Sequence, residues 1–115
     1  MEITFPWPHK DLSPNARVHW AVKSKRARAQ KMDAFARTYE AKAKVDWEGD
    51  IHLFIDFFQP DRRERDQDNM LSSCKSMLDG MAEALGVNDK RFRLHPYVRD
   101  GIGGMVKIKI ARSVE

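Results

Sequence analysis

The sequence predicts a single domain of the α/β class, α+β-like in character, with one mixed β-sheet and two main helices packed on it. The chain has 115 residues, which is enough for one modest core and typical of one domain, residues 1–115. Short segments in which every second residue is apolar, as in strands, alternate along the chain with longer segments in which apolar residues recur every three to four positions, as in helices. Its hydrophobic content of 42% and aromatic content of 10% are typical of a folded protein.

The first part of the chain predicts a strand, a loop and a long helix. Apolar residues alternate from Ile3 to Trp7, which predicts a short strand that the neighbouring prolines stop. Residues 9–17 are rich in turn formers and are expected to form a loop. A helical pattern then extends from about His19 to Lys44. Five of its apolar residues share one helical face: Met32, Phe35, Ala36, Tyr39 and Ala43.

The second part of the chain predicts three more strands and one more helix. The run Ile51–Phe58 alternates, with apolar residues on both faces, so we expect a mostly covered central strand. A second helix is expected over about Met70–Leu85, with Asp68–Asn69 as suitable N-cap residues. Strands at about residues 92–99 and 105–110 complete a β-α-β-α-β-β order. One sheet backed by helices on one face is the economical architecture for this order.

Charge and cysteine content narrow the classes of function. The net charge is +4, and residues 16–32 contain six basic residues and no acidic one. Such a segment suits a polyanionic partner, although a solvated helix face explains the same pattern. The single cysteine, Cys74, excludes an internal disulfide. No apolar run approaches the roughly 20 residues of a membrane span, and the first residues lack the pattern of a signal peptide, so we expect a cytoplasmic protein without a membrane partner.

Residues 60–75, PDRRERDQDNMLSSCK, carry the strongest chemical signal. Asp66 and Asp68 lie two positions apart beside three arginines. Clustered carboxylates in a basic protein suit Mg²⁺, which prefers hard oxygen ligands and assists phosphodiester hydrolysis. Lys75 could donate to the attacked phosphate. The alternative to a metal site is that these residues have structural roles. Asp68 would cap the helix, Asp66 would neutralise Arg65 or Arg63, and Lys75 would form an ordinary ion pair with Asp79.

A third aspartate, Asp89, follows the second predicted helix. A helix of about sixteen residues would hold it about 24 Å from the first two aspartates. Either the loop that carries Asp89 folds back, or a second subunit completes the site.

Three segments resemble the RusA family, the Holliday junction resolvases of bacteria and their phages. PWPHKDLSPNARVHW is similar to the opening strand and basic loop of that family. PDRRERDQDNMLSSCKSMLDGM resembles its Pro-Asp-Arg-Arg, Asp-x-Asp-Asn, Lys and Leu-Asp pattern, and VNDKRF resembles its Asp-containing segment after the helix. Together the three segments cover most of the chain, in the same order as in the family.

The resemblance implies a crossover junction endodeoxyribonuclease: a Mg²⁺-dependent homodimer that nicks four-way or branched DNA symmetrically during recombination and repair, and in which we expect Mn²⁺ to substitute. Asp66, Asp68 and Asp89 match the catalytic, metal-binding aspartates. Ser72 occupies the place of the catalytic lysine, and Lys75 follows three residues later, so an inserted turn is the simplest account. The basic residues and their neighbours would contact DNA: Asn15, Arg17, His19, Lys23, Lys25, Arg26, Arg62, Arg63 and Arg65.

Two other functions remain open at this point. A non-catalytic protein that binds junction or duplex DNA would use the same basic surface. An RNA-directed role is the third hypothesis, and the sequence contains no aromatic stacking motif of the known RNA-binding modules.

Overall fold

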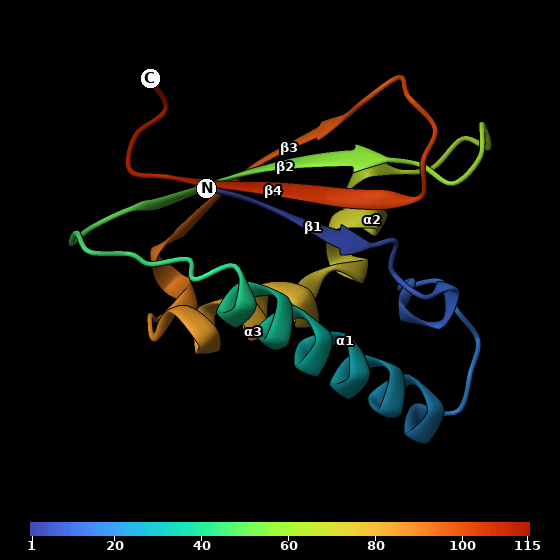
Figure 1. Cartoon of the computed structure of the whole chain (residues 1–115). Helices are drawn as coiled ribbons and strands as arrows, with labels where there is room; N and C mark the ends of the chain where they lie inside the picture. The colour runs from blue at the N-terminus through green and yellow to red at the C-terminus, as the bar shows by residue number, and fades with distance from the viewer.

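A computed structural model describes all residues, 1–115, and contains one four-stranded mixed sheet with helices on one of its faces (Figure 1). The strand order is β1-β4-β2-β3; β2 pairs parallel with β3, and β4 pairs antiparallel with both β1 and β2. The predicted fold class and the mixed sheet are confirmed. The elements are β1 (Glu2–Pro6), η1 (Lys10–Leu12), α1 (Trp20–Glu40), β2 (Ile51–Phe58), α2 (Gln67–Ser73), α3 (Lys75–Leu85), η2 (Asp89–Arg91), β3 (Phe92–Val98) and β4 (Met105–Ala111).

The strand directions gather three loops at one end of the molecule. Because β1, β2 and β3 run in one direction and β4 in the other, the loops after the first three strands lie at the same edge of the sheet. Gly104 joins two of them, since its N–H donates to the Gln59 carbonyl (3.2 Å) and its carbonyl accepts from the Trp7 N–H (3.3 Å). In sheets of this kind, ligands bind beyond the carboxyl ends of the strands. We call this region the loop end: residues 7–19, 59–66 and 99–104.

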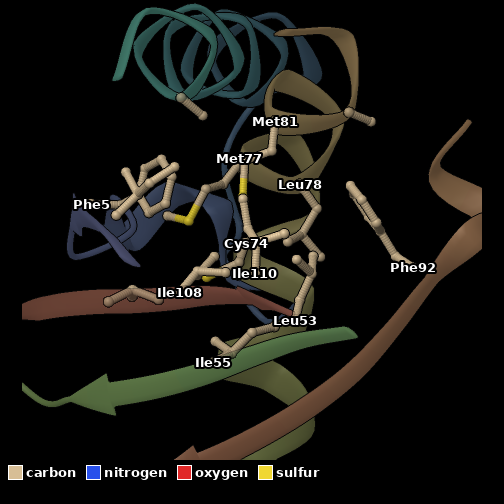
Figure 2. Close-up of a cluster of buried hydrophobic side chains, with 14 of the residues drawn as sticks. Phe5, Leu53, Ile55, Cys74, Met77, Leu78, Met81, Phe92, Ile108 and Ile110 are labelled. Carbon is tan, nitrogen blue, oxygen red and sulfur yellow. The ribbon is translucent and has the colours of Figure 1, made fainter. Parts of the chain in front are cut away.

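The hydrophobic core fills the space between the sheet and the helices (Figure 2). The inner face of β2 is fully buried, as its alternating pattern predicts. Side chains of β4 and α3 pack against it, and the methionines of α3 are core residues. The main buried side chains are Phe5, Ile51, Leu53, Ile55, Phe57, Cys74, Met77, Met81, Val106 and Ile108.

The other face of the sheet has no helix over it (Figure 1). We predicted that β2 is central and mostly covered; it is central, but its outer residues His52, Phe54, Asp56 and Phe58 are only half-buried. Neighbouring side chains provide the partial cover. The Phe54 ring stacks on His95 with a centroid distance of 4.7 Å.

The apolar face predicted for the first helix is not the face that packs. Met32 and Tyr39 are 66% and 71% exposed, whereas Ala34 and Thr38 are buried against α3. Gly80 of α3 explains the difference. It allows α1 to approach so closely that only small residues of α1 fit between the helices, and the large apolar residues therefore point outward.

The second predicted helix is two helices, α2 and α3, which meet at Cys74. Cys74 leaves the α conformation (φ −99°, ψ 5°). The Gln30 side chain of α1 occupies the gap: its Nε2 donates to the Ser73 carbonyl (2.9 Å), and its Oε1 accepts from the Met77 N–H (3.0 Å). One glutamine thus satisfies backbone groups on both sides of the break and holds α2 and α3 against α1.

Thr38 offers a test of the packing between α1 and α3. Its hydroxyl is buried and has no hydrogen-bond partner, which costs free energy. Thr38→Val keeps the branched shape and removes the unpaired hydroxyl. We expect the free energy of unfolding in urea to rise by about 1 kcal/mol. Thr38→Ala, which leaves a cavity, is expected to lower it, and a loss of stability in Thr38→Val would contradict this account.

Cys74 is expected to be inert in the native protein. Burial raises the pKa of its thiol to about 12, so the reactive thiolate is scarce at neutral pH. Iodoacetamide should modify Cys74 quickly in urea and at least a hundredfold more slowly in buffer, as followed by intact-mass measurement. Rapid modification of folded protein would show that the junction between α2 and α3 opens readily.

None of the helices is both long and apolar enough to cross a membrane.

Candidate functional site

A polar cleft of about 550 Å³ opens at the loop end, between the loops after β1 and β2 and the start of α2. Only two of its fifteen lining residues are hydrophobic. Four residues predicted from the sequence line it: Asn15, Arg63, Arg65 and Asp66. Seven other polar residues line the cleft without having been predicted as site residues, although all lie in the segments that carry the family resemblance: His9, Lys10, Ser13, Asp61, Glu64, Asn69 and Ser73.

Asp66 caps the helix that carries the acidic pair. Its backbone is extended (φ −73°, ψ 127°), and its Oδ1 accepts from the Asp68 N–H at 2.8 Å. The prediction that Asp68 or Asn69 caps this helix is therefore wrong, because α2 begins at Gln67, three residues before the predicted start at Met70. Asp66 lines the cleft, and its second carboxylate oxygen, Oδ2, has no hydrogen-bond partner within the chain.

Asp68 lies in the first turn of α2 and is exposed. Its carboxylate forms neither a hydrogen bond nor an ion pair within the chain, and the helix N-terminus favours negative charge there. Asp66 and Asp68 therefore present uncommitted carboxylate oxygens two residues apart. This donor set suits Mg²⁺, which commonly binds one or two carboxylates and completes its coordination with water and phosphate.

Asp89 lies far from this pair. The Gln67 side chain donates to the Pro96 carbonyl (3.2 Å), so the start of α2 lies beside Pro96 in β3. Asp89 precedes β3, and the strand from Phe92 to Pro96 alone spans about 13 Å. Figure 1 shows η2, in orange, at the opposite end of the sheet from the loop end. Within one chain the loop does not fold back, and no three His, Cys, Asp or Glu side chains are placed to hold one metal ion.

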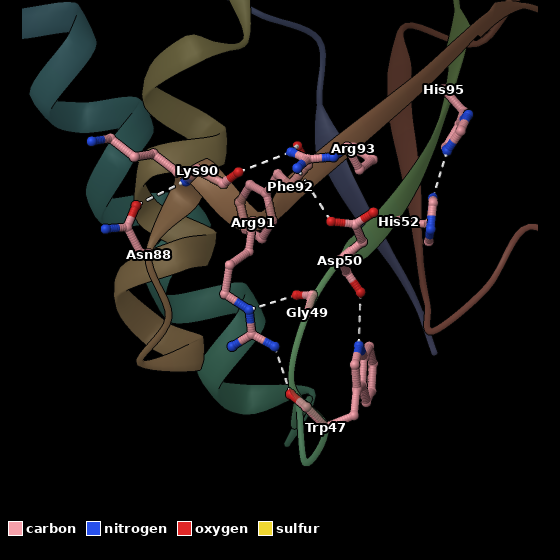
Figure 3. A network of polar contacts seen from close by, with 10 residues as sticks. All are labelled: Trp47, Gly49, Asp50, His52, Asn88, Lys90, Arg91, Phe92, Arg93 and His95. Carbon is pink, nitrogen blue, oxygen red and sulfur yellow. Dashed lines mark hydrogen bonds and ion pairs between the residues drawn. The ribbon is translucent and has the colours of Figure 1, made fainter.

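The segment around Asp89 is fixed in this position (Figure 3). Arg91 donates to the carbonyls of Trp47 and Gly49, in the turn before β2. Arg93 forms an ion pair with Asp50 at 3.2 Å. These contacts tie the segment to the turn at the start of β2, away from the cleft.

Lys75 is the first residue of α3 and is exposed. The break at Cys74 separates Lys75 from Asp68, which lies in α2, so the two residues do not share one helix as a single helix over residues 70–85 would suggest. Lys75 does not line the cleft, and it forms no ion pair with Asp79. Its amine is therefore free of partners within the chain.

Several of the predicted DNA-binding residues have structural roles. The His19 Nδ1 atom caps α1 by accepting from the Ala21 N–H (3.1 Å). Lys23 donates to the Ser13 carbonyl (3.2 Å) and ties α1 to the preceding loop. The Arg26 guanidinium lies 3.8 Å from the Asp11 carboxylate.

Arg65 is the most firmly held of the basic residues. Only 19% of its side chain is exposed; it forms an ion pair with Asp61 (2.9 Å), donates to Gln59 (3.0 Å) and lies over the Trp7 ring (5.6 Å). The Arg65 guanidinium, with help from Arg63, lowers the pKa of Asp61 below its usual value. Arg65 therefore organises the wall of the cleft.

The remaining basic residues are available to a ligand. Arg17, Lys25 and Arg62 are exposed and have no hydrogen-bond or ion-pair partner in the chain. Arg63 is 78% exposed, with one ion pair to Asp61 at 3.5 Å. Lys10 adds an exposed cation to the cleft lining. Exposed cations thus lie at the loop end together with Asp66, which lines the cleft, and Asp68 follows in the first turn of α2.

Comparison with known proteins identifies a relative. A protein of Xylella fastidiosa (strain Temecula1), described as an uncharacterized protein, is 45% identical to this chain over 115 residues. The match covers 94% of this chain and 74% of the relative, so the chain belongs to the same family as that protein. No family model matches the chain.

Proposed function

We propose that this chain is a Mg²⁺-dependent, structure-selective DNA endonuclease that resolves four-way junctions by symmetric phosphodiester hydrolysis. One observation carries the proposal: Asp66 and Asp68 offer uncommitted oxygens at the start of α2, beside a cleft bordered by exposed cations. The resemblance to the RusA family supplies the substrate class. We propose that the protein acts in DNA recombination and repair in the cytoplasm.

Each group at the loop end would have a distinct task. Asp66 and Asp68 would hold Mg²⁺, and the chemistry that this ion supplies in such a site is polarisation of the phosphoryl group and activation of water. Arg63 and Lys10 would bind the phosphates beside the cut, and the fixed Arg65 would keep the wall of the cleft in place. Such phosphate contacts orient the strand without reading its sequence.

We further propose that the protein acts as a homodimer in which Asp89 completes the site of the partner. The free carboxylates lie beside one end of β3, and Asp89 precedes the other end. A two-fold axis that exchanges the two ends of β3 would bring each Asp89 toward the other subunit's aspartate pair. Two equivalent sites related by such an axis match the symmetry of a four-way junction.

Mixing two inactive variants tests this arrangement. Asp66→Asn and Asp89→Asn proteins are each expected to be folded and inactive. A heterodimer of the two contains one intact composite site, so the mixture should recover nicking of one strand. A mixture that stays inactive, although subunits exchange, would contradict a site shared between subunits. If either variant alone cuts normally, the assignment of that aspartate is wrong.

Loss of an exposed cation is expected to lower the affinity for DNA and to make that affinity less dependent on salt concentration. Lys25→Gln and Arg63→Gln should each reduce junction affinity and lower the slope of log K against log salt concentration by about 1. Fluorescence anisotropy at several NaCl concentrations measures both quantities. Lys44→Gln, an exposed residue at the other end of α1, is the matched control. An unchanged slope for Lys25→Gln would exclude its contact with phosphate.

A further inference from the structure

Trp20 occupies an unusual position on α1. It is the first residue of the helix, and 74% of its surface is exposed. Eighteen residues, or five helical turns of 3.6 residues, separate it from the buried Thr38, so the two residues lie on the same side of α1. Figure 1 shows that the start of α1 extends beyond α3, so α3 does not cover its first turn; the neighbours there are η1 and the loop before α1.

The surroundings hold the Trp20 ring ready for a partner. His19 is fixed as the helix cap, and its ring lies 5.5 Å from the Trp20 ring at an angle of 33°. Lys23, one turn further along α1, is tied to the Ser13 carbonyl of the preceding loop. The backbone and the flanking ring are therefore both held in place, and little conformational freedom remains to be lost on binding.

The charges around Trp20 select the kind of partner. Six basic residues and no acidic residue lie between residues 16 and 32. Arg17 and Lys25, on either side of Trp20 in the sequence, are exposed and have no partner within the chain. A large exposed aromatic ring among free cations matches a nucleic acid, whose bases stack on aromatic rings while its phosphates contact the cations. An apolar protein surface would gain nothing from these cations.

We infer that Trp20 stacks on a nucleobase that is exposed where the DNA branches, and that it thereby helps the protein to prefer branched over linear DNA. Bases inside a continuous duplex are stacked on both sides, whereas a branch point leaves base faces open or easily opened. Ser13 and Asn15, in the loop before α1, line the cleft that holds Asp66. Trp20 is the first helical residue after this loop and therefore lies beside the loop end. The inference rests on the proposed function for the choice of DNA but concerns recognition, and it assigns Trp20 no part in hydrolysis.

Tryptophan fluorescence tests this contact directly. The protein is titrated in EDTA with an unlabelled four-way junction and with a linear duplex of the same sequence. Stacking on a base should quench the emission of Trp20 with the junction and much less with the duplex. The titration uses Trp7→Phe as its parent protein, because Trp7 lines the cleft and bound DNA could quench it as well. In that protein the quenching should disappear when Trp20→Phe is added and persist when Trp47→Phe is added, because Trp47 lies in the turn before β2 at the opposite end of the sheet. Quenching that persists in Trp20→Phe would overturn the inference.

Binding of labelled DNA supplies the second measurement. Trp20→Ala should bind the junction about ten- to a hundredfold more weakly, the loss expected when one stacked base is no longer held, and Trp20→Phe should recover part of it. Duplex affinity should change little. Equal junction affinity of Trp20→Ala and the parent protein would contradict the contact. A change in oligomeric state of Trp20→Ala without DNA, seen by sedimentation, would instead assign Trp20 to a protein interface.

The two proposals fail in different ways. If the parent protein cuts junctions with Mg²⁺ but Trp20→Ala binds and cuts them equally well, the stacking inference is wrong and the nuclease assignment stands. If the junction quenches Trp20 but no divalent metal produces cleavage, the nuclease assignment is wrong and the stacking inference stands.

Discussion

Asp66→Asn is expected to abolish junction cleavage while the fold and junction binding persist. Asparagine caps helices as well as aspartate does, so the hydrogen bond from the Asp68 N–H is kept and α2 should still begin at Gln67. What changes is the charge of a ligand oxygen. Loss of an outer-shell partner of a metal site already costs about ten- to a hundredfold in affinity or activity, so loss of a direct ligand should cost at least about a hundredfold. Single-turnover nicking assays with Mg²⁺ measure the rate.

The neighbouring variants separate chemistry from folding. Asp68→Asn should lose cleavage to a similar extent and lose at most about 1 kcal/mol of stability, because the start of α2 favours the negative charge that is removed. Asp46→Asn, an exposed aspartate in the loop before β2, is the matched control and should cut normally. Asp66→Ala should lose cleavage and, in addition, about 1 kcal/mol of stability with the cap. If Asp66→Asn retains full activity, Asp66 is a structural cap only and the candidate metal site is wrong.

Gly80→Val is expected to cause the largest loss of stability. A Cβ atom at position 80 would overlap the Lys31 carbonyl oxygen of α1 and lie 3.1 Å from the Ala34 Cβ and the Phe35 nitrogen. Two of these three atoms belong to the backbone, so no side-chain rotation relieves the clash and the helices must move apart. Overpacking of this kind costs about 1–3 kcal/mol and sometimes more. We expect about 3 kcal/mol for valine, a large fraction of the stability of a small domain.

Urea denaturation of three variants isolates the cause. Ala84→Val adds the same branched residue one turn further along α3, where the site is only half-buried, and should cost about 0.5 kcal/mol from helix propensity alone. Gly80→Ala should fall between the two valine variants, because alanine also clashes but favours the helix. Equal stability of Gly80→Val and Ala84→Val would show that α1 and α3 do not pack as closely as described.

The parts of the fold that follow from local pattern were predictable from the sequence. The alternation from Ile51 to Phe58 identified a strand whose inner face is fully buried, and the order of patterns identified the mixed sheet. Strand alternation is reliable here because a shift of one residue would expose the whole inner face of β2. The predicted end of the second helix at Leu85 is likewise confirmed, because Gly86, left-handed at φ 69°, caps α3 there.

The inner face of α1 was not predictable from its apolar residues. Met32, Phe35 and Tyr39 satisfy a helical period, but Gly80 of another helix decides which side of α1 can pack. The break at Cys74 also depends on a distant residue, Gln30, whose side chain satisfies the freed backbone groups. Both features result from tertiary contacts that no local window of sequence contains.

The candidate site was predictable in part. Local spacing placed Asp66 and Asp68 together at the start of a helix, and the structure keeps them there with uncommitted oxygens. Spacing could not show that Arg65 is committed to Asp61, or that His19 and Lys23 hold α1 in place. The length of the second predicted helix already implies that Asp89 is far from the pair, and the structure places it at the other end of β3.

Cleavage of a labelled, mobile four-way junction tests the central claim most directly. The purified protein is incubated with the junction in Mg²⁺ and in EDTA, beside a linear duplex of the same sequence. The account predicts paired, symmetric nicks in the junction alone, only with Mg²⁺ or Mn²⁺, and their loss in Asp68→Asn. Tight junction binding without cleavage in either metal would contradict it and would identify a protein that binds DNA junctions without cutting them.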